Sequence, residues 1–516
     1  MFKTFKFSNS FQISNFKFKI PLLFLGIFLL ALFLRTYNIF SIPIFADEAI
    51  YIRWAQVMRA VASLRFLPLS DGKQPLFMWM MIPLLKVVTD PLVAGRILSV
   101  LSGLGALVGV FLLTNKLFGK KPALFASFLY AISPFTVFFD RMALVDSMLA
   151  MFGIWSLYLG VLTAQTLRLD YAMLTGFALG GAYLTKSPGI FFLALLPTTI
   201  LAAKWKDNKH SNLNQVGKLI GLWSVSWIIG LGLYNILRLG PEFHMLAIRN
   251  KDYVYSFADF FKHPFDPLRP HMGDIQSWFW NLLPATTLGA AVFGIVASFK
   301  KSWKMVLLLL AWCLGPLFVE AALAKVFTAR YVLFTATPMF ILAGAGAAFA
   351  AKKIKTLTVV GLLGAMPLTI NYLLLTAPEK APLHKNERAG YLEEWTSGTG
   401  IREIAKYIKA EKIKNPEQNI VVGTEGYFGT LPDGLQIYLS DIPGIVVRGV
   451  GVTIFDVDSS LIDAKKAGNR VFLVVNSTRF KIENPELKGL VLVNQYLKAK
   501  RSNGTQEALT LWELAK

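Results

Sequence analysis

Long apolar segments recur through the first 375 residues of this 516-residue chain, and they constrain its fold more than any other feature. A helix needs about 20 predominantly apolar residues to cross a bilayer. Eleven segments approach or exceed that length: 20–40, 92–114, 122–139, 144–164, 172–185, 189–203, 219–237, 278–299, 305–323, 332–350 and 356–375. The hydrophobic fraction of the chain is 54%. The sequence therefore predicts a polytopic α-helical membrane protein rather than a soluble enzyme.

Basic residues between these segments predict how the chain is threaded through the membrane. They cluster in the N-terminal stretch and in alternate connections: Lys3/Lys6/Lys17/Lys19, Lys116/Lys120/Lys121, Arg168, Lys204/Lys206/Lys209/Lys218, Lys300/Lys301/Lys304 and Lys352/Lys353/Lys355. If all eleven segments cross, every cluster lies on one side, and the positive-inside rule makes that side the cytoplasm. We therefore expect about eleven spans in the cell membrane, with the N-terminus inside and the C-terminus outside.

Two segments near the start of the chain need separate interpretation. The apolar segment 75–88 is short, and counting it as a span would invert every later basic cluster. It is expected to be an interfacial or re-entrant helix on the outer face. The first span follows lysines and precedes no small-residue cleavage site, so we expect it to be uncleaved, with Arg35 snorkelling near its outer end.

The formal net charge of +22 does not indicate nucleic acid binding. The lysines lie in short clusters between apolar segments, where membrane topology explains them, rather than along one helix face or in a tail. The one cysteine, Cys313, lies within an apolar segment, so an intramolecular disulfide and a cysteine metal cluster are excluded. The partners expected on this basis are membrane lipids.

The pattern changes in the last quarter of the chain. The segment 401–413, IREIAKYIKAEKI, has helical periodicity. It is followed by β-branched stretches at 419–423, 444–450, 470–476, 490–496 and 508–514. We therefore predict a membrane domain at 1–375, with outer-loop interfacial helices in 41–90, and an extracytoplasmic α/β domain at 376–516. The glycine-rich stretch GTEGYFGTL lacks the Lys-Ser/Thr of a phosphate-binding loop and is interpreted as a turn.

Two adjacent carboxylates, Asp47 and Glu48, stand in the loop after the first apolar segment. The residues after them have near-helical apolar spacing, with Arg53, Arg59 and Arg65 on another face. This pattern predicts an amphipathic helix in the headgroup plane that holds a carboxylate where a lipid headgroup lies. The alternative is that Asp47 only caps the helix, since acidic residues favour helix N-termini. A cap does not require the second acid.

Five basic residues lie at or near the outer ends of the expected spans, where the positive-inside rule disfavours them. They are Lys73, Arg96, Arg141, Lys186 and Arg330. Ionisable groups at such depths are candidates for function, although long side chains can also snorkel. Five of them on one face predict a pocket for a phosphate or pyrophosphate group.

Other polar residues on the same face have less specific patterns. Asp140 and Asp146 are separated by one or two helical turns and are expected to point into one outer cavity, or else to pair locally with Arg141. Four histidines lie outside, but no HxxxH or HExxH spacing links them. We therefore expect no dedicated metal site, while a divalent cation held by carboxylates and a lipid phosphate stays an alternative.

Taken in order, these features match a known pattern of motifs. The order is a basic N-terminus, one span, Asp47-Glu48 with Tyr51, Lys73-x-Pro75-Leu76, Arg96, RxALxD from Arg141 to Asp146, LTKxPG from Leu184 to Gly189, and Arg330-Tyr331-x-Leu333 followed by Pro338. The chain resembles the GT-C membrane glycosyltransferases of the protein O-mannosyltransferase and aminoarabinose transferase type, bacterial branch. The resemblance covers residues 1 to about 400, including GYLEEWTSGTGIREIAKYI at 390–408.

The resemblance implies transfer of a monosaccharide from a polyprenyl-phosphate donor to an acceptor hydroxyl, with inversion, on the extracytoplasmic face. The acceptor class is a protein, a lipid or a glycan, and no cofactor is required. By position, Asp47 would be the general base and Glu48 its support. The leaving lipid phosphate would be stabilised by the five basic residues, and Tyr51, Asp146 and Tyr331 would contact substrate.

The sequence departs from the family pattern at two positions. Gln74 stands where members often carry His or a second Pro, and Ser187 stands where a Gly commonly follows the Lys. Both positions are expected to lie near the donor, so the sugar and the lipid are not transferred from relatives.

Two other functions compete with the glycosyltransferase. A transporter or flippase of lipid-linked sugars would place ionisable residues at the bilayer midplane in broken, paired helices, whereas here they gather on one side. A non-catalytic scaffold would leave Asp47 and Glu48 without a role.

Overall fold

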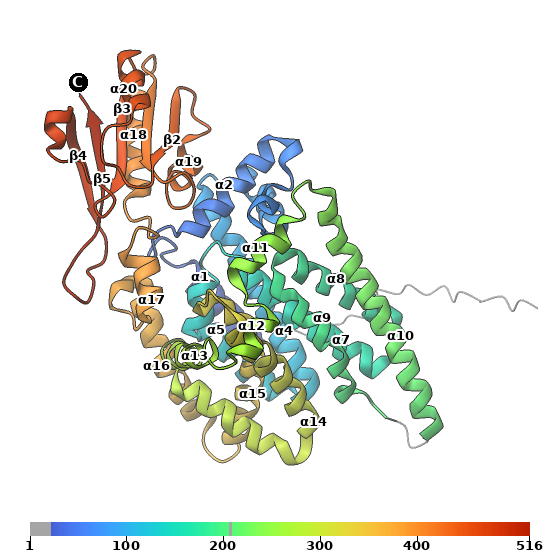
Figure 1. The fold of residues 1–516 in the computed structure, drawn as a ribbon. Coiled ribbons are helices and arrows are strands. Elements are labelled where there is room, and N and C mark those ends of the chain that lie inside the picture. Colours follow the sequence, from blue (N-terminus) through green and yellow to red (C-terminus); the bar gives the residue numbers. More distant parts are fainter. Residues whose placement is uncertain (1–21, 206–208, 516) are drawn as a thin grey trace, which may run out of the picture.

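The computed structural model describes residues 22–205 and 209–515. A bundle of helices carries a smaller sheet domain at one end (Figure 1). The N-terminal lysines Lys3, Lys6, Lys17 and Lys19, the start of the first apolar segment, and Lys206 lie outside the described residues.

Each apolar segment that the structure describes is mainly helical. The helices are α1 (Leu22–Thr36), α4 (Pro91–Phe118), α5 (Lys120–Ile132), α6 (Pro134–Phe139), α7 (Asp146–Thr166), α8 (Leu169–Thr185), α9 (Ile190–Leu195), α10 (Lys209–Tyr234), α14 (Ala285–Leu323), α15 (Leu333–Ala350) and α16 (Thr356–Thr376). Pro134 separates α5 from α6, because proline lacks the amide hydrogen that would continue a helix.

The segments predicted at 278–299 and 305–323 differ from the observed helices. Residues up to Leu282 belong to a separate helix, α13 (Leu268–Leu282), which ends shortly before Pro284. The rest forms α14, which bends at Ser302 (φ −141°, ψ 35°) inside a lysine cluster. The predicted break between the two segments is therefore present as a kink.

Six helices in the described ranges are long and apolar enough to span a bilayer: Pro91–Phe118, Asp146–Thr166, Asn212–Leu239, Ala285–Leu323, Ala329–Ala350 and Thr356–Thr376. Large apolar side chains project outward from them, such as Ile228, Val296 and Leu357, which are 70%, 67% and 84% exposed. In a membrane protein, the surface that contacts lipid is apolar, and these exposed side chains form such a surface. The chain is an integral membrane protein, and the count of eleven spans and their orientation stay predictions.

Arg35, at the end of α1, does not snorkel as predicted. Its side chain is fully buried, and its Nε donates to Asp140 Oδ2 at 2.9 Å. The guanidinium also donates to the carbonyls of Ala31, Tyr130 and Ala131. The reason is local packing: Asp140 provides a buried counter-charge beside α1, and a paired charge is tolerated inside protein.

The first outer loop forms α2 (Ala46–Ala60) and α3 (Leu76–Val87). The predicted helix after Asp47 is confirmed, but it does not lie alone on the surface. It packs against α3 and against α19 (Asp433–Leu439) of the C-terminal domain, and Gln56 donates to the carbonyl of Ile437 at 2.8 Å. Helix α3 has 12 residues, too few to cross a bilayer. Protein therefore covers α2 on two sides.

The C-terminal domain contains the five predicted strands in one sheet of order β2-β1-β3-β5-β4. The strands are β1 (Ile420–Glu425), β2 (Ile445–Gly451), β3 (Arg470–Asn476), β4 (Leu490–Leu497) and β5 (Ala508–Leu514). Strands β2, β1 and β3 are parallel, whereas β5 is antiparallel to both β3 and β4. The five predicted strands are thus confirmed, and they form one C-terminal sheet.

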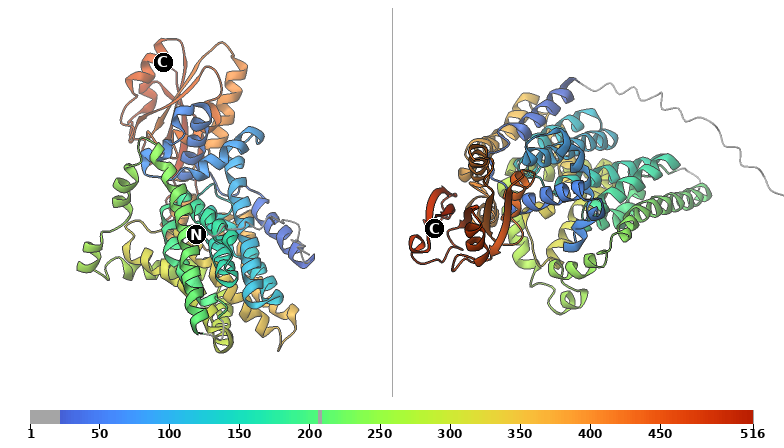
Figure 2. Two further views of the ribbon diagram at one scale, coloured as in Figure 1. Left: turned by 90° about the vertical axis from the view of Figure 1, so that its right-hand side faces the viewer. Right: turned by 90° about the horizontal axis from the view of Figure 1, so that it is seen from above.

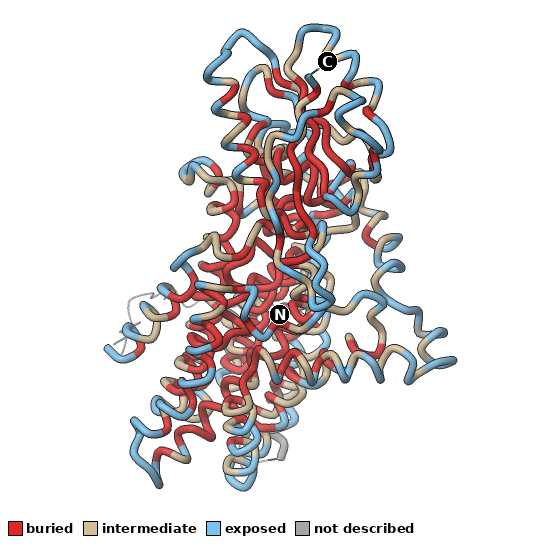
Figure 3. Tube along the Cα trace, turned by 90° about the vertical axis from the view of Figure 1, so that its left-hand side faces the viewer, coloured by how far each residue is buried: buried red, intermediate tan, exposed pale blue. Residues whose placement is uncertain are grey.

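Helices cover both faces of this sheet, and alternating side chains along β3 explain why. Phe472 and Val474 pack in the core shared with α18 (Ile401–Lys414) and α19. Val471 and Leu473 pack in a second core with Leu461 of α20 (Ser459–Lys466). The first core continues into the helical bundle, as the buried interior in Figure 3 shows. The domain is therefore packed onto the bundle, at one end of it (Figure 2).

Candidate active site

A cavity below the C-terminal domain gathers most of the predicted site residues. Its walls come from α2, the turn before α3, the start of α7, the end of α8 and the segment before α15. The lining residues are Asp47, Tyr51, Lys73, Gln74, Met78, Val145, Asp146, Thr185, Lys186, Arg330 and Tyr331. Seven of the ten residues predicted from the sequence are among them.

Acidic and basic groups alternate across this cavity. Arg330 Nη2 donates to Asp47 Oδ2 at 2.5 Å, and Lys186 Nζ donates to Asp146 Oδ1 at 2.6 Å. Lys73 Nζ donates to the phenol oxygen of Tyr253 at 2.8 Å. Three cations thus face two carboxylates, which leaves one positive charge for an anionic ligand.

Asp47 is held in its charged form by these cations. Burial acts to raise its pKa, but the charge and hydrogen bond of Arg330, with smaller contributions from Lys73 and Lys186, outweigh burial and lower the pKa below its ordinary value. Its side chain is 28% exposed, so the carboxylate is also accessible. Burial, followed by the charge of Asp47, raises the pKa of Tyr51 well above its ordinary value, so the phenol stays a hydrogen-bond donor.

Glu48 lies behind the cavity, although Asp47 precedes it directly. Its carboxylate is completely buried and accepts Nε and Nη2 of Arg96 at 2.9 and 2.8 Å. It also accepts the amide hydrogens of Ala143 at 2.6 Å and Phe45 at 3.0 Å. The capping role considered for Asp47 thus falls to Glu48, which reaches back to the residue before α2.

Arg96 and Arg141 are also placed outside the cavity lining. Arg96 donates to the carbonyls of residues 39, 42 and 43 in addition to Glu48. Arg141 donates to the carbonyls of residues 34, 37 and 38 and to the hydroxyl of Ser41. It pairs with neither Asp140 nor Asp146, contrary to the local pairing considered for it. Both arginines fix the loop between α1 and α2.

Gln74, one of the two positions that depart from the family pattern and were expected near the donor, also lines the cavity. Its Nε2 donates to the hydroxyl of Ser187, the other such position, at 2.8 Å. The two residues directly follow Lys73 and Lys186 in the sequence. Tyr253, whose phenol accepts from Lys73, was not predicted: it is the last residue of α11 (Met245–Tyr253), and nothing in its sequence surroundings indicated that contact.

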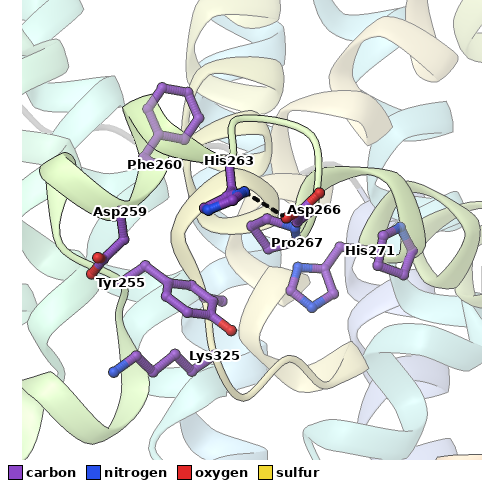
Figure 4. A pocket seen from close by; sticks show the side chains of 10 residues that line it. Tyr255, Asp259, Phe260, His263, Asp266, Pro267, His271 and Lys325 are labelled. Atoms are coloured by element: carbon purple, nitrogen blue, oxygen red, sulfur yellow. Dashed lines mark ion pairs between the residues drawn. The ribbon is translucent and has the colours of Figure 1, made fainter.

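A second cavity, of about 560 Å³, lies between α12 (Phe257–Lys262), α13 and the end of α14. In Figure 4, His263 points toward Asp266, and Lys325 lies below Tyr255. None of the predicted site residues line it. In the parts of the chain that the structure describes, no three His, Cys, Asp or Glu side chains are grouped to hold a metal ion.

The fold is similar to that of ArnT, of which two solved structures match nearly the whole chain. ArnT from Cupriavidus metallidurans in the apo state is 16% identical, with a TM-score of 0.54 over 95% of this chain and 97% of that chain. Its structure bound to undecaprenyl phosphate is 15% identical, with a TM-score of 0.53 over the same shares. An apo oligosaccharyltransferase from Archaeoglobus fulgidus is 12% identical, with a TM-score of 0.48, over 88% of this chain and 69% of that chain.

A protein-family model also matches part of the sequence. The family model described as dolichyl-phosphate-mannose-protein mannosyltransferase matches residues 72–229. That segment includes Lys73, Asp146 and Lys186 of the cavity. No curated protein sequence matches the chain. The predicted resemblance to the mannosyltransferase and aminoarabinose transferase superfamily is confirmed by the family model and the shared fold.

Proposed function

We propose that this protein transfers a monosaccharide from a polyprenyl-phosphate donor to an acceptor hydroxyl, with inversion at the sugar carbon. One observation carries the proposal: an accessible carboxylate, Asp47, shares a cavity with Lys73, Lys186 and Arg330. A base and a cationic phosphate site are the two elements that such a transfer needs. The undecaprenyl phosphate bound to ArnT supports the donor class.

In the proposed step, the acceptor hydroxyl gives its proton to Asp47 as its oxygen attacks C1 of the sugar. The bond between C1 and the phosphate oxygen breaks, and its electron pair stays on the lipid phosphate. Lys73, Lys186 and Arg330 neutralise that developing charge, so no general acid and no cofactor are required. A divalent cation is an addition that this scheme does not need.

Arg330 has two roles in this scheme. It pairs with Asp47 at 2.5 Å, and a donor phosphate would compete with Asp47 for the same guanidinium. When Arg330 turns to the phosphate, Asp47 loses a stabilising partner and becomes a stronger base. Donor binding would thus prepare the base for the acceptor.

The buried residues behind the cavity take a supporting role in the proposal. Glu48 and Arg96 fix the first turn of α2 and therefore the position of Asp47. Arg141 fixes the loop that leads into α2. We assign these three to positioning and not to contact with substrate. Tyr51, Asp146 and Tyr331 line the cavity and are proposed substrate contacts.

The donor class is tested directly with purified full-length protein. Release of lipid phosphate is measured with a panel of polyprenyl-phosphate monosaccharides, including hexose and pentose donors, with and without candidate acceptors. We expect release with at least one donor. Movement of an intact lipid-linked sugar across a vesicle membrane without release would instead favour the flippase, and absence of both would favour the scaffold. The expected extracytoplasmic location of the site is tested by adding a membrane-impermeant donor analogue to either side of sealed vesicles.

The lowered pKa of Asp47 predicts the pH dependence of kcat/KM, which reports groups in the free enzyme. A carboxylate with a lowered pKa stays charged until the pH falls below its ordinary value of about 3.9, so the acid limb should lie below about pH 4. Replacing Arg330 with methionine removes the charge that lowers the pKa of Asp47, while burial still acts to raise that pKa. The acid limb of the pH profile should therefore move to higher pH. The check is the pH profile of both proteins. A wild-type limb near neutral pH would contradict the assignment of Asp47 as the base.

Lys186→Met should weaken donor binding. A charge-assisted hydrogen bond contributes roughly 1.5–3 kcal/mol, so we expect the donor KM to rise about 10- to 100-fold. Lys325→Met is the matched control, because Lys325 lines the second cavity. An unchanged donor KM in Lys186→Met would remove Lys186 from the phosphate site.

A further inference from the structure

A second cluster lies on the C-terminal domain, and none of its residues lines the cavity or was assigned a role above. It consists of Trp395, Tyr427, Phe428 and Arg479, which we name the acceptor platform. We propose that the acceptor platform binds a saccharide acceptor and directs its hydroxyl toward Asp47. The proposal rests on the proposed function, since it assigns the acceptor of that same site.

The acceptor platform lies at the carboxyl ends of parallel strands. Tyr427 and Phe428 follow β1, and Arg479 follows β3, which is parallel to β1. In open α/β sheets, ligands bind beyond the carboxyl ends of the strands. Lys498, whose Nζ donates to the carbonyl of Glu394 at 2.8 Å, ties the same end of the sheet to the segment that carries Trp395.

Three aromatic rings of the platform are open to solvent. Tyr427, Phe428 and Trp395 are 68%, 47% and 36% exposed. The two residues of the loop are flanked by Gly426 (φ +72°) and Gly429 (φ +113°), backbone conformations that other residues rarely adopt. The glycines thus allow a tight turn that presents both rings outward. Grouped exposed aromatic side chains mark binding surfaces.

A planar cationic group stands beside one of these rings. The Arg479 guanidinium lies 4.0 Å from the centre of the Trp395 ring. Within the described residues it makes no hydrogen bond, and its one ion pair is with Glu425 at 3.6 Å. Hydrogen-bond donors of the guanidinium are therefore left for a ligand.

This combination favours a saccharide. The C–H face of a sugar ring packs on an aromatic face, while its hydroxyls bond to guanidinium and amide groups. A peptide is instead recognised by backbone pairing with a strand edge or by pockets for alternate side chains. The four platform residues lie beyond the strand ends and provide neither.

One face of α2 connects the platform to the cavity. Asp47, Tyr51 and Trp54 recur at helical spacing, and Tyr51 lines the cavity. The ring centroids of Tyr51 and Trp54 are 6.0 Å apart, and those of Trp54 and Phe428 are 5.7 Å apart. From Asp47 to Trp54 the helix rises roughly 10 Å. An oligosaccharide, rather than a single sugar, would therefore reach from the platform to the base.

The test measures binding without a donor. Purified full-length protein is applied to immobilised neutral and acidic oligosaccharides and to serine- and threonine-containing peptides. The variants are Tyr427→Ala/Phe428→Ala, Arg479→Lys and Leu487→Ala. Leu487 is the matched control, since it is 85% exposed and precedes β4, at the end of the strands opposite the platform. Thermal unfolding of each protein shows that it is folded.

We expect the wild type to bind at least one oligosaccharide and the double variant to bind it at least tenfold more weakly. Arg479→Lys should also bind more weakly, because lysine lacks the planar group that stacks on Trp395, whereas Leu487→Ala should match the wild type. Binding of peptides alone, binding of no saccharide, or equal saccharide binding by the double variant would overturn the proposal. The binding test contains no donor, so its result does not depend on the transfer reaction. If the separate assay detects no release of lipid phosphate, that result refutes only the proposed transfer.

Discussion

Asp47→Asn should lower the rate of sugar transfer by about 10²- to 10⁴-fold, the usual contribution of a general base. Asparagine keeps the size of the side chain but does not take up the acceptor proton. The measurement is transfer of labelled sugar to acceptor in a single turnover, at saturating donor. Because Arg330 and both lysines remain, we expect the variant to bind donor.

The matched control is Asp441→Asn. The Asp441 side chain is 72% exposed and pairs with Arg59 at 3.4 Å, away from the cavity. Its transfer rate should equal that of the wild type. Transfer by Asp47→Asn within a factor of a few of the wild-type rate would show that Asp47 is not the base, and Asp146, the other acid lining the cavity, would become the candidate.

Glu48→Gln should destabilise the protein by about 3–5 kcal/mol, the cost of leaving one member of a buried ion pair without its partner. Arg96 is completely buried, so water cannot replace the lost carboxylate. We expect a lower unfolding temperature in detergent and a lower yield of folded protein. Activity per folded molecule should fall less than in Asp47→Asn, since Glu48 does not line the cavity.

A double-mutant cycle separates the ion pair from other losses. Arg96→Met should also be destabilising, because the carbonyls of residues 39, 42 and 43 lose their donor. The combined variant should lose less stability than the sum of the two single variants, since the first change already breaks the pair. Exact additivity would show that the two residues do not interact. The exposed pair of Arg59 and Asp441 serves as the control and should contribute less than about 1 kcal/mol.

Much of the fold was predictable because local residue patterns indicate most of its helices and strands. Apolar stretches predicted the helices of the bundle, and β-branched stretches predicted all five strands within about two residues. Local pattern does not show where a helix breaks within an apolar run. The separation of α13 from α14, which falls within the predicted segment 278–299, was therefore missed. The bend at Ser302 lies between the predicted segments 278–299 and 305–323, where lysines interrupt the apolar pattern.

The sequence by itself determined which charged residues lie on the same side of the membrane. The apolar segments are embedded in the membrane, and acids and bases near their ends therefore need partners on that side. The sequence thereby identified Asp47, Lys73, Asp146, Lys186 and Arg330, which the structure brings to one cavity. Only the tertiary structure decided which charged groups face that cavity and which are paired inside the protein. Asp47 and Glu48 are neighbours in sequence, yet successive helical residues point about 100° apart. One carboxylate therefore faces the cavity, and the other is enclosed with Arg96.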